Sequence, residues 1–375
     1  MCRSPISGIP RVKNQPKEYY FHPQILSGIC LVFASRRSQG ANGAMADAIS
    51  KRCGTYRMVA LDLDGTLLQS NHQLGDIQAE YLRTLYKSGF RICIATGRAA
   101  PSVYDIVKKL ALPDPIPVVC SNGARGFLLS YDNNDVAGDQ QKYQEELFYT
   151  PLKREAVIKT IQLAKTQGYF VQYYLSDGIY ANPITESHRE MIKQYEIYTG
   201  SCIEIVDDDF DRFLVGADQE DKLPSKLLVR CEKYEFDRCH PSFVKLLNST
   251  DSNGDTSNTG KKLDRLAHIV AAFNDDLDWF LEILHPEVNK GNGLSNMCHK
   301  LKIPIKNVIA MGDGTNDIEF LQMSGLGIAM KNAHGSLKEV ADYVIKWTND
   351  EHGVMKTLDA LKMKGELCCT VLKDL

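Results

Sequence analysis

Residues 58–68 read MVALDLDGTLL, an apolar run that ends in two carboxylates and a glycine. A short apolar run without polar alternation is typical of a parallel strand that is buried on both faces. Asp62 and Asp64 follow at its carboxyl end, where residues i and i+2 point to the same side and where open α/β sheets bind their ligands. Two like charges there are costly unless a cation neutralises them, and oxygen ligands suit Mg²⁺. An acid pair alone is weak evidence, but its position at a strand end favours a metal site.

The sequence around this stretch alternates strand and helix, and the alternation returns near the end of the chain. Strands are predicted for MVALDL (58–63), FRICIAT (90–96), IPVVCSNG (116–123), KNVIAMGDG (306–314), LGIAM (326–330) and DYVIK (342–346). Helices are predicted for the stretches 74–89, 101–112, 289–303, 316–325, 336–341 and 350–364. Strand–helix alternation implies a parallel sheet with helices on its faces. The two ends therefore predict two halves of one doubly wound α/β sheet.

The middle of the chain has a different pattern. It is rich in aromatic residues and in short β-like runs such as YFVQYYL (169–175) and KLLVRC (226–231), with one helix-like stretch at 150–168. We interpret it as a mixed α+β domain inserted into the first. The expected organisation is a leader at 1–56, a discontinuous main domain at 57–123 and 286–365, and an inserted domain at 124–285 with a polar, flexible loop at 248–262.

Composition excludes several classes of protein. The chain has 375 residues, of which 43% are hydrophobic and 24% charged, with a net charge of -3, so it is ordinary globular protein without the basic character of a nucleic-acid binder. Its longest apolar run, at 25–34, is too short for a membrane span, which needs about 20 residues. The 11 cysteines form no CxxC pair, which argues against a zinc ribbon and favours free, buried thiols in a reducing compartment.

The first 57 residues differ from the rest in charge. They hold nine lysines and arginines but only two acids. An arginine-bearing, acid-poor leader is typical of an organelle transit peptide, which would send the protein to a plastid or another organelle. Two plainer interpretations stay open: a disordered tail, or sequence upstream of a true start at Met45. Under either of these we expect a cytoplasmic protein.

Polar residues follow the second predicted strand and precede a predicted helix. In ATGR, Thr96 offers a hydroxyl and Gly97 lets a ligand approach the backbone, although an ordinary turn would have the same composition. Lys290, in VNKGNGL, offers a mobile point charge suited to a phosphate, although a lone lysine is more often solvated surface.

The stretch MGDGTNDIEFL brings acids to another strand end. Gly312 and Gly314 predict a tight turn, and Asn316 is able to cap the helix that follows. Capping accounts for one such residue and leaves Asp313 and Asp317 unexplained. We expect both acids at the same sheet edge as the first acid pair.

In this order, DLDGT, ATGR, Lys290 and GDGTND resemble the four motifs of the haloacid dehalogenase superfamily of phosphohydrolases. The long insertion between the second motif and the lysine, entered through SNGA (121–124), resembles the Cof-type subfamily. The resemblance covers roughly 56–361 and leaves out the leader and the loop at 248–262. It implies a Rossmann-like α/β core with an inserted α+β cap.

The resemblance also implies roles. The catalytic residues would be Asp62, as the nucleophile that forms an aspartyl-phosphate, and Asp64, as the general acid and base. The phosphate would be bound by Thr96, Gly97, Lys290 and Asn316. Mg²⁺ would be bound by Asp62, Asp64 through its backbone carbonyl, and Asp313, with support from Asp317. Phosphoryl transfer depends on positioning and charge neutralisation, which agrees with such a set.

The function that this resemblance implies is Mg²⁺-dependent hydrolysis of small phosphorylated metabolites. Sugar phosphates and phosphorylated cofactors such as pyridoxal phosphate or flavin mononucleotide are the expected substrates. The alternatives are a sugar phosphomutase or a sucrose-phosphate-type phosphatase and, from another class, a non-catalytic module that accepts phosphate or binds a metabolite. We expect no nucleic-acid or membrane partner, and a monomer or weak homodimer.

The cap would choose the substrate and exclude water on closing. Tyr180 and Asn182, in DGIYANP, are candidate contacts, although Tyr180 fits the interior of the cap equally well.

The transit-peptide interpretation and the two plainer ones predict different distributions in cells of the source organism. If residues 1–44 target an organelle, a tagged full chain should reach it, and a tagged chain that starts at Met45 should stay in the cytoplasm. Imaging of both fusions tests this, and identical distributions would contradict the transit peptide.

Overall fold

A computed structural model describes residues 56–131, 142–208, 210–214, 222–231, 233–248, 265–272 and 280–363. The predicted leader, apart from Tyr56, and the predicted loop, apart from Asn248, lie outside these residues. Within the described part of the chain, none of the helices combines the length and the apolarity that crossing a membrane requires.

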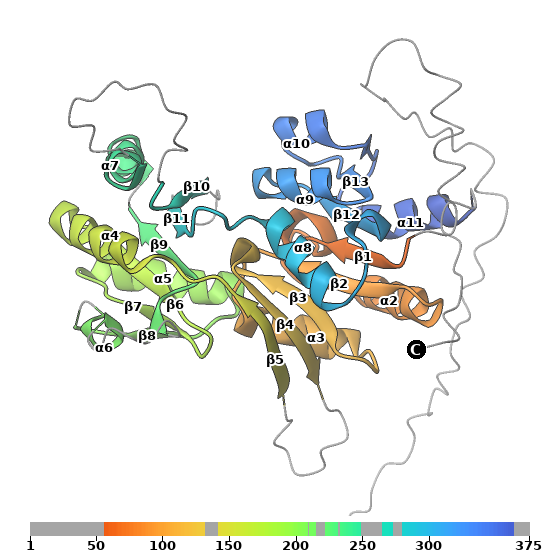
Figure 1. Cartoon of the computed structure of the whole chain (residues 1–375), viewed down its shortest axis with the longest axis horizontal. Helices are drawn as coiled ribbons and strands as arrows, with labels where there is room; N and C mark the ends of the chain where they lie inside the picture. Colours follow the sequence, from red (N-terminus) through yellow and green to blue (C-terminus); the bar gives the residue numbers. More distant parts are fainter. Residues whose placement is uncertain are drawn as a thin grey trace, which may run out of the picture. The chain divides into compact units, whose positions relative to one another are not determined.

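The larger of two sheets combines strands from the early and from the late parts of the described chain (Figure 1). Its eight strands lie in the order β14 (Tyr343–Val344), β13 (Leu326–Ala329), β12 (Val308–Gly312), β1 (Met58–Leu61), β2 (Arg91–Ala95), β3 (Ile116–Cys120), β4 (Arg125–Tyr131) and β5 (Lys142–Tyr149). Pairing is parallel from β14 to β3 and antiparallel at β4 and β5. Strand β1 is central, with Met58 opposite both Arg91 and Val308. The predicted doubly wound sheet is confirmed.

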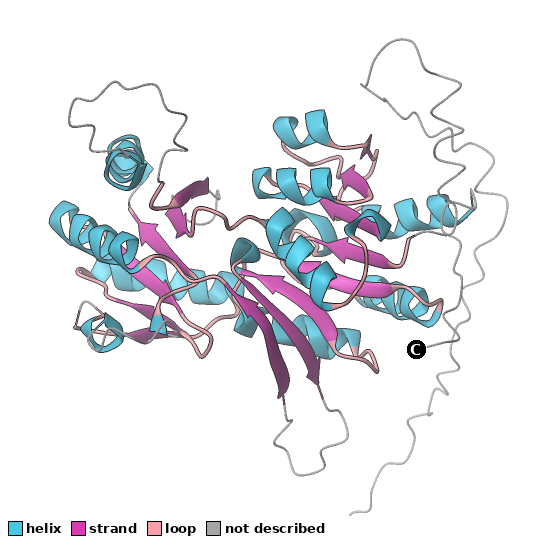
Figure 2. Ribbon diagram, in the orientation of Figure 1, coloured by secondary structure: helices cyan, strands magenta, loops and turns pink. Residues whose placement is uncertain are grey.

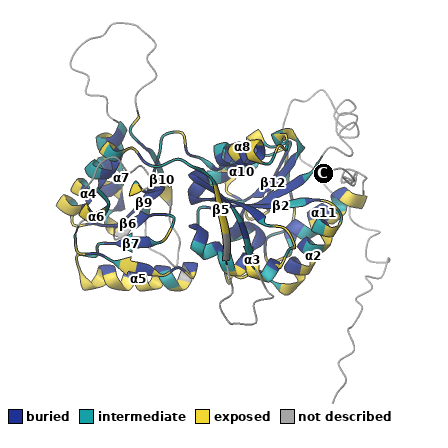
Figure 3. Cartoon of the chain, turned by 60° about the horizontal axis from the view of Figure 1, so that its bottom comes forward, coloured by how far each residue is buried: buried dark blue, intermediate teal, exposed yellow. Residues whose placement is uncertain are grey.

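Helices cover both faces of this sheet. They are α2 (Asp76–Lys87), α3 (Tyr104–Leu110), α8 (Lys290–Lys300), α9 (Ile318–Met323), α10 (Gly335–Val340) and α11 (Gly353–Met363). Helices α8 and α10 lie on one side and α2 and α3 on the other (Figure 3). Every residue of β1 is fully buried, which explains why its sequence shows no polar alternation.

The second sheet lies within the predicted insertion (Figure 2). Its six strands lie in the order β10 (His268–Ala272), β11 (Phe280–Leu284), β9 (Lys226–Arg230), β6 (Phe170–Tyr174), β7 (Ile179–Ala181) and β8 (Ile203–Ile205). The helices of this part are α4 (Arg154–Gln167), α5 (Glu186–Thr199), α6 (Asp211–Leu214) and α7 (Phe236–Asn248). Mixed pairing and a separate cluster of buried side chains agree with the predicted α+β cap.

Two details differ from the simplest expectation. Strands β4 and β5 belong to the range predicted as the inserted domain, yet they pair with β3 and extend the larger sheet. The domain boundaries at 123/124 and 285/286 stay predictions.

The helix predicted for 101–112 begins as a 3₁₀ turn at Ala100–Val103, with the proline in its first turn, before α3 starts.

Helix α8 approaches the turn after β3 unusually closely. A Cβ atom on Gly293 would lie 2.5 Å from the Cα of Gly123 and 2.6 Å from a methyl carbon of Val119. Gly123 has φ +104°, and a Cβ there would lie 2.2 Å from the carbonyl oxygen of Asn289. These glycines therefore let the start of α8 lie against the end of β3.

The Gly293→Ala substitution should lower the midpoint of thermal unfolding. Overpacking costs about 1–3 kcal/mol, which the gain of about 1 kcal/mol in helix propensity offsets only in part. Gly335→Ala is the matched control, because its Cβ would enter open space. We expect no loss of stability there, and an equal loss in both variants would contradict the packing constraint.

Candidate active site

The chain turns sharply after β1, and the turn explains the glycine of DLDGT. Gly65 has φ +74°, and a Cβ there would lie 2.1 Å from the Oδ2 atom of Asp313. The next residue, Thr66, donates a hydrogen bond from its hydroxyl to Oδ1 of Asp313 at 3.0 Å. Only glycine permits both the left-handed backbone and this close approach. The turn thus brings the first and the last motif together.

Lys290 contacts two other predicted site residues. Its Nζ lies 2.6 Å from Oδ1 of Asp62 and 2.7 Å from Oδ1 of Asp317, and all three side chains are buried. Lys290 is the first residue of α8, and the side chain of Asn289 caps that helix by accepting from the N–H of Asn292 at 2.7 Å. Burial would lower the pKa of Lys290, but the two carboxylates outweigh it and raise the pKa. The ammonium is therefore held charged against the carboxylates of Asp62 and Asp317.

The GDGTND turn is held by Asp317. Its Oδ2 accepts from the backbone N–H groups of Asp313 and Gly314, each at 3.0 Å. Asn316 turns the other way, and its Nδ2 donates to Oδ1 of Asn122 at 2.9 Å. The capping role considered for Asn316 is not what the structure has, because this amide contacts the turn after β3.

The acids of the site fit a divalent cation. Oxygen atoms of Asp62, Asp313 and Asp317 lie within 4.8 Å of one another. Three carboxylates and one ammonium leave two negative charges in a largely buried place. Burial, and next the charge of Asp317, raise the pKa of Asp313 to about 7. Burial also raises the pKa of Asp62 well above its ordinary value, in spite of Lys290. A bound cation would remove this penalty, and oxygen-only donors suit Mg²⁺.

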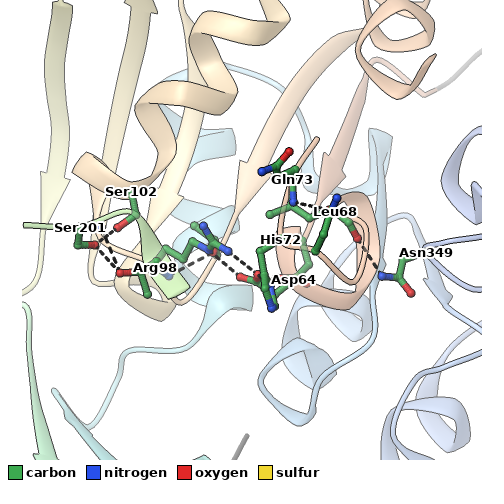
Figure 4. A network of polar contacts seen from close by, with 12 residues as sticks. Asp64, Leu68, His72, Gln73, Arg98, Ser102, Ser201 and Asn349 are labelled. Carbon is green, nitrogen blue, oxygen red and sulfur yellow. Dashed lines mark hydrogen bonds and ion pairs between the residues drawn. The ribbon is translucent and has the colours of Figure 1, made fainter. Parts of the chain in front are cut away.

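Asp64 has different surroundings (Figure 4). Its carboxylate accepts from Nε of Arg98 at 2.8 Å and from Nη2 at 2.5 Å, and it contacts Nδ1 of His72 at 3.1 Å. Burial opposes ionisation, but the hydrogen bonds from His72 and Arg98 outweigh it and lower the pKa of Asp64 well below the usual range. Its side chain is 32% exposed, against 7% for Asp62, so Asp64 remains within reach of a ligand.

The ATGR loop lies beside the turn after β3. Thr96 is buried, and its Oγ1 accepts from the N–H of Arg98 at 3.1 Å, which leaves the hydroxyl proton for another acceptor. A Cβ on Gly97 would lie 3.2 Å from Oδ1 of Asn122. The structure thus brings the ATGR loop and the GDGTND turn to the same amide side chain.

Four residues of the site were given no role from the sequence. Arg98 and Asn122 stand inside motifs, and Lys226 and Glu282 are buried charges on β9 and β11. A lysine at the start of an apolar strand, Lys226, indicated a buried charge, but its partner Glu282 lies 56 residues further along the chain. No sequence pattern links two such distant positions.

A cavity of about 240 Å³ adjoins the site. Asn122, Lys290 and Asn316 line it on one side, and strand β10 with His268 on another. The Nδ1 atom of His268 lies 2.8 Å from the carbonyl oxygen of Val288. A carbonyl only accepts, so Nδ1 carries the proton and a neutral His268 offers Nε2 as an acceptor.

The two cap residues proposed as substrate contacts have neighbours within the insertion. The ring of Tyr180 packs edge-on against Phe213, with ring centroids 4.8 Å apart. Oδ1 of Asn182 accepts from the N–H of Val171 at 3.0 Å. These contacts favour the alternative interpretation of Tyr180, as part of the interior of the inserted domain.

The cysteine prediction is confirmed in part, because all six cysteines among the described residues are free and five are buried, whereas Cys202 is exposed. Cys93 and Cys120 are buried free thiols on β2 and β3.

Comparison with known proteins identifies the family of the chain. A family model for haloacid dehalogenase-like hydrolases matches residues 59–358, so the chain belongs to that family. Phosphatase YwpJ of Bacillus subtilis is 26% identical over 316 residues, which cover 80% of this chain and 97% of YwpJ. YitU of the same organism, a 5-amino-6-(5-phospho-D-ribitylamino)uracil phosphatase, is 24% identical over 311 residues, covering 80% and 96%.

Among solved structures, the sugar phosphatase BT4131, of subclass IIB of the superfamily, is similar with a TM-score of 0.58 and 19% identity, over 83% of this chain and 100% of that one. Together the family model and the relatives identify an enzyme, a phosphatase of the haloacid dehalogenase family, and the solved structure shows the same fold. The resemblance that the motifs predicted is confirmed.

Asp313→Asn should separate the charge penalty from metal binding. Without metal at pH 8, the wild-type carboxylate is ionised above its pKa of about 7, and this ionisation destabilises the folded state. The variant should therefore unfold a few degrees higher in chelator. Added Mg²⁺ should raise the midpoint of the parent and not that of the variant. Scanning calorimetry tests both points, with Asp105→Asn, an exposed acid, as control. Equal stabilisation of all three proteins by Mg²⁺ would contradict the assignment.

Proposed function

We propose that this chain is a Mg²⁺-dependent phosphatase of small phosphorylated metabolites that acts through an aspartyl-phosphate on Asp62. The observation that carries the proposal is the pairing of unlike acids at one strand end. Asp62 is buried against Lys290, whereas Asp64, two residues on, is bound by Arg98 and His72 and stays partly exposed. This difference in surroundings supports the assignment of Asp62 as the nucleophile and Asp64 as the proton carrier.

Two displacements make up the reaction. A carboxylate oxygen of Asp62 attacks phosphorus, the bond from phosphorus to the leaving oxygen breaks, and Asp64 gives that oxygen a proton. Asp64 then takes a proton from water, whose oxygen attacks phosphorus and releases inorganic phosphate and the free Asp62 carboxylate. Dividing one difficult displacement into two is the advantage of covalent catalysis.

Arg98 bears on the protonation state of Asp64. With its two hydrogen bonds in place, Asp64 is a carboxylate, which is the form required to activate water in the second step. The first step requires the acid form. The proposal therefore includes a looser Asp64–Arg98 contact when substrate is bound.

The phosphoryl oxygens would be bound by the loops around these acids. Lys290 supplies a charge, the hydroxyl of Thr96 a donor and the backbone beside Gly97 a close approach. Asn316 supplies an amide at the GDGTND turn. Such a set positions the group and neutralises its charge, which is most of what phosphoryl transfer requires.

The residues that would hold Mg²⁺ are Asp62, Asp313 and the backbone carbonyl of Asp64, while Asp317 fixes the turn that carries Asp313. When bound, the ion would neutralise negative charge on the phosphoryl oxygens. The charge imbalance of the acid cluster supports this assignment.

The leaving group would be small. The cavity beside Lys290 has room for a sugar or a single heterocyclic ring, and its lining combines apolar residues of β10 and β11 with His268 and Glu319. YitU, whose name gives a phosphorylated ribitylaminouracil as substrate, supports the inclusion of phosphorylated cofactors and related compounds beside sugar phosphates.

Phosphate release from a panel of phosphorylated compounds tests the proposal. The panel contains hexose phosphates, pyridoxal phosphate, flavin mononucleotide and the YitU substrate, each with Mg²⁺ and with chelator. We expect turnover of some compounds, lost in chelator and reduced at least about 10³-fold in Asp62→Asn, because the nucleophile is gone. Asp105→Asn should keep full activity.

Release that survives Asp62→Asn would overturn the assignment of the nucleophile. No release from any compound, by a folded chain that binds Mg²⁺, would contradict the phosphatase proposal for this panel. Analysis of the sugar product separates a mutase, which would return the phosphoryl group to another hydroxyl.

A further inference from the structure

Lys226 and Glu282 form a buried ion pair on neighbouring strands of the second sheet. Lys226 begins β9 and is 1% exposed, Glu282 is in the middle of β11 and is 6% exposed, and their charged groups are in direct contact. Burial would lower the pKa of Lys226, but Glu282 outweighs it and raises the pKa, so the ammonium of Lys226 is held charged. Removing two charges from water is costly, and a buried pair is often no more stabilising than apolar residues of similar size. Stability alone therefore does not explain it.

The pair also contacts two loops at the edge of the larger sheet where the candidate active site lies. Nζ of Lys226 donates to the carbonyl oxygen of Gly97 at 3.0 Å, in the ATGR loop. The second carboxylate oxygen of Glu282 accepts from the side-chain amide of Asn122. The insertion thus contacts the turn after β2 and the turn after β3 through one ion pair.

Asn122 also forms hydrogen bonds with two of the predicted phosphate-binding segments. Its Oδ1 accepts from Asn316 in the GDGTND turn at 2.9 Å, and its N–H donates to the carbonyl oxygen of Thr96 at 3.1 Å. One residue therefore connects the ATGR loop, through its backbone N–H, with the GDGTND turn and the ion pair, through its side chain. Asn122 is buried, and both of its side-chain polar atoms are used.

The turn that carries Asn122 is strained. Ser121, Asn122 and Gly123 have φ values of +49°, +54° and +104° in succession. Left-handed backbone at two consecutive non-glycine residues is unfavourable and persists only where the surroundings enforce it. Ser225, next to Lys226, also contacts this turn, with its Oγ 3.4 Å from Oγ of Ser121. Contacts from the insertion thus converge on the strained turn.

We propose that Lys226 and Glu282 are positioning residues that set the geometry of the phosphate-binding loops when the insertion is seated on them, with Asn122 as the link. The inference rests on the proposed phosphatase function. It assigns these residues no contact with substrate: they act through Gly97 and Asn316. A small displacement of such loops is enough for a large loss of rate, because an error of about 1 Å in placement can cost about 10²-fold.

The decisive experiment compares single and double variants of the pair in the full chain. Lys226→Met or Glu282→Met alone should lower the midpoint of thermal unfolding, because the remaining charge is buried without its partner. Each should lower kcat about 10–100-fold, with a smaller change in KM. The Lys226→Met/Glu282→Met variant should regain stability, because apolar side chains replace both charges, yet keep the low kcat. Recovery of kcat together with stability would overturn the proposal and leave a merely structural ion pair.

A second variant covers the case in which the pair variants fail to fold. Asn122→Gly keeps a residue suited to positive φ, leaves the ion pair in place and removes the link to Asn316. It should show the same loss of kcat. Normal kcat in this variant would overturn the role given to Asn122 and with it the proposal.

Hydrogen exchange gives a readout that needs no turnover. Amides of residues 96–98 and 313–317 should exchange faster in the double variant and in Asn122→Gly than in the parent, and unchanged exchange would contradict the coupling. If the parent releases no phosphate from any compound, the proposed function fails, and exchange still tests the coupling by itself. Tyr173→Phe is the matched control: it removes a buried hydrogen bond of 2.8 Å to the carbonyl oxygen of Lys222. It should lower stability slightly and leave kcat and loop exchange unchanged.

Discussion

The contact between Lys290 and its two carboxylates is the constraint on which the site depends. The two carboxylates offset the free-energy cost of burying the ammonium of Lys290 between Asp62 and Asp317. The ammonium in turn offsets the cost of burying the two carboxylates. The pairing fixes where helix α8 begins, since Lys290 is its first residue. It also fixes the GDGTND turn, because Asp317 binds Lys290 with one oxygen and the turn's backbone with the other.

The positive and negative charges of this cluster do not cancel, and this imbalance is the main electrostatic property of the site. One ammonium does not balance three acids, so the folded chain is left with a concentrated negative charge at the edge of its sheet. A protein built for stability alone would have no reason to gather these groups. Under the proposed function, the excess charge would attract a cation to this edge, and the cation together with Lys290 would bind a phosphoryl group.

Most of the main fold could be predicted from the sequence, because its strands are short apolar runs and its helices have clear starts and ends. The core of the site could be predicted for the same reason: parallel strands end at one edge, so the motifs that follow them must meet. Strands β4 and β5 were harder, since nothing local says which sheet an antiparallel pair will join. The contacts of Asn122, Lys226 and Glu282 depend on how the insertion packs, and that packing has no period in the sequence. Tyr180 was misleading because an aromatic residue on a short strand fits a binding surface and a domain interior equally well.

The position of strand β10 has a consequence for how the enzyme can change. The acids and the lysine of the site lie at the edge of the larger sheet, whereas β10, which lines the adjoining cavity, pairs among the described residues with β11 alone and is the outermost strand of the other sheet. Residues on an outer strand can be exchanged with little effect on the rest of the sheet. Under the proposed function, selection for a new leaving group can therefore act on β10 while the acids and the lysine stay as they are. Chemistry and choice of substrate would then lie on separate pieces of chain.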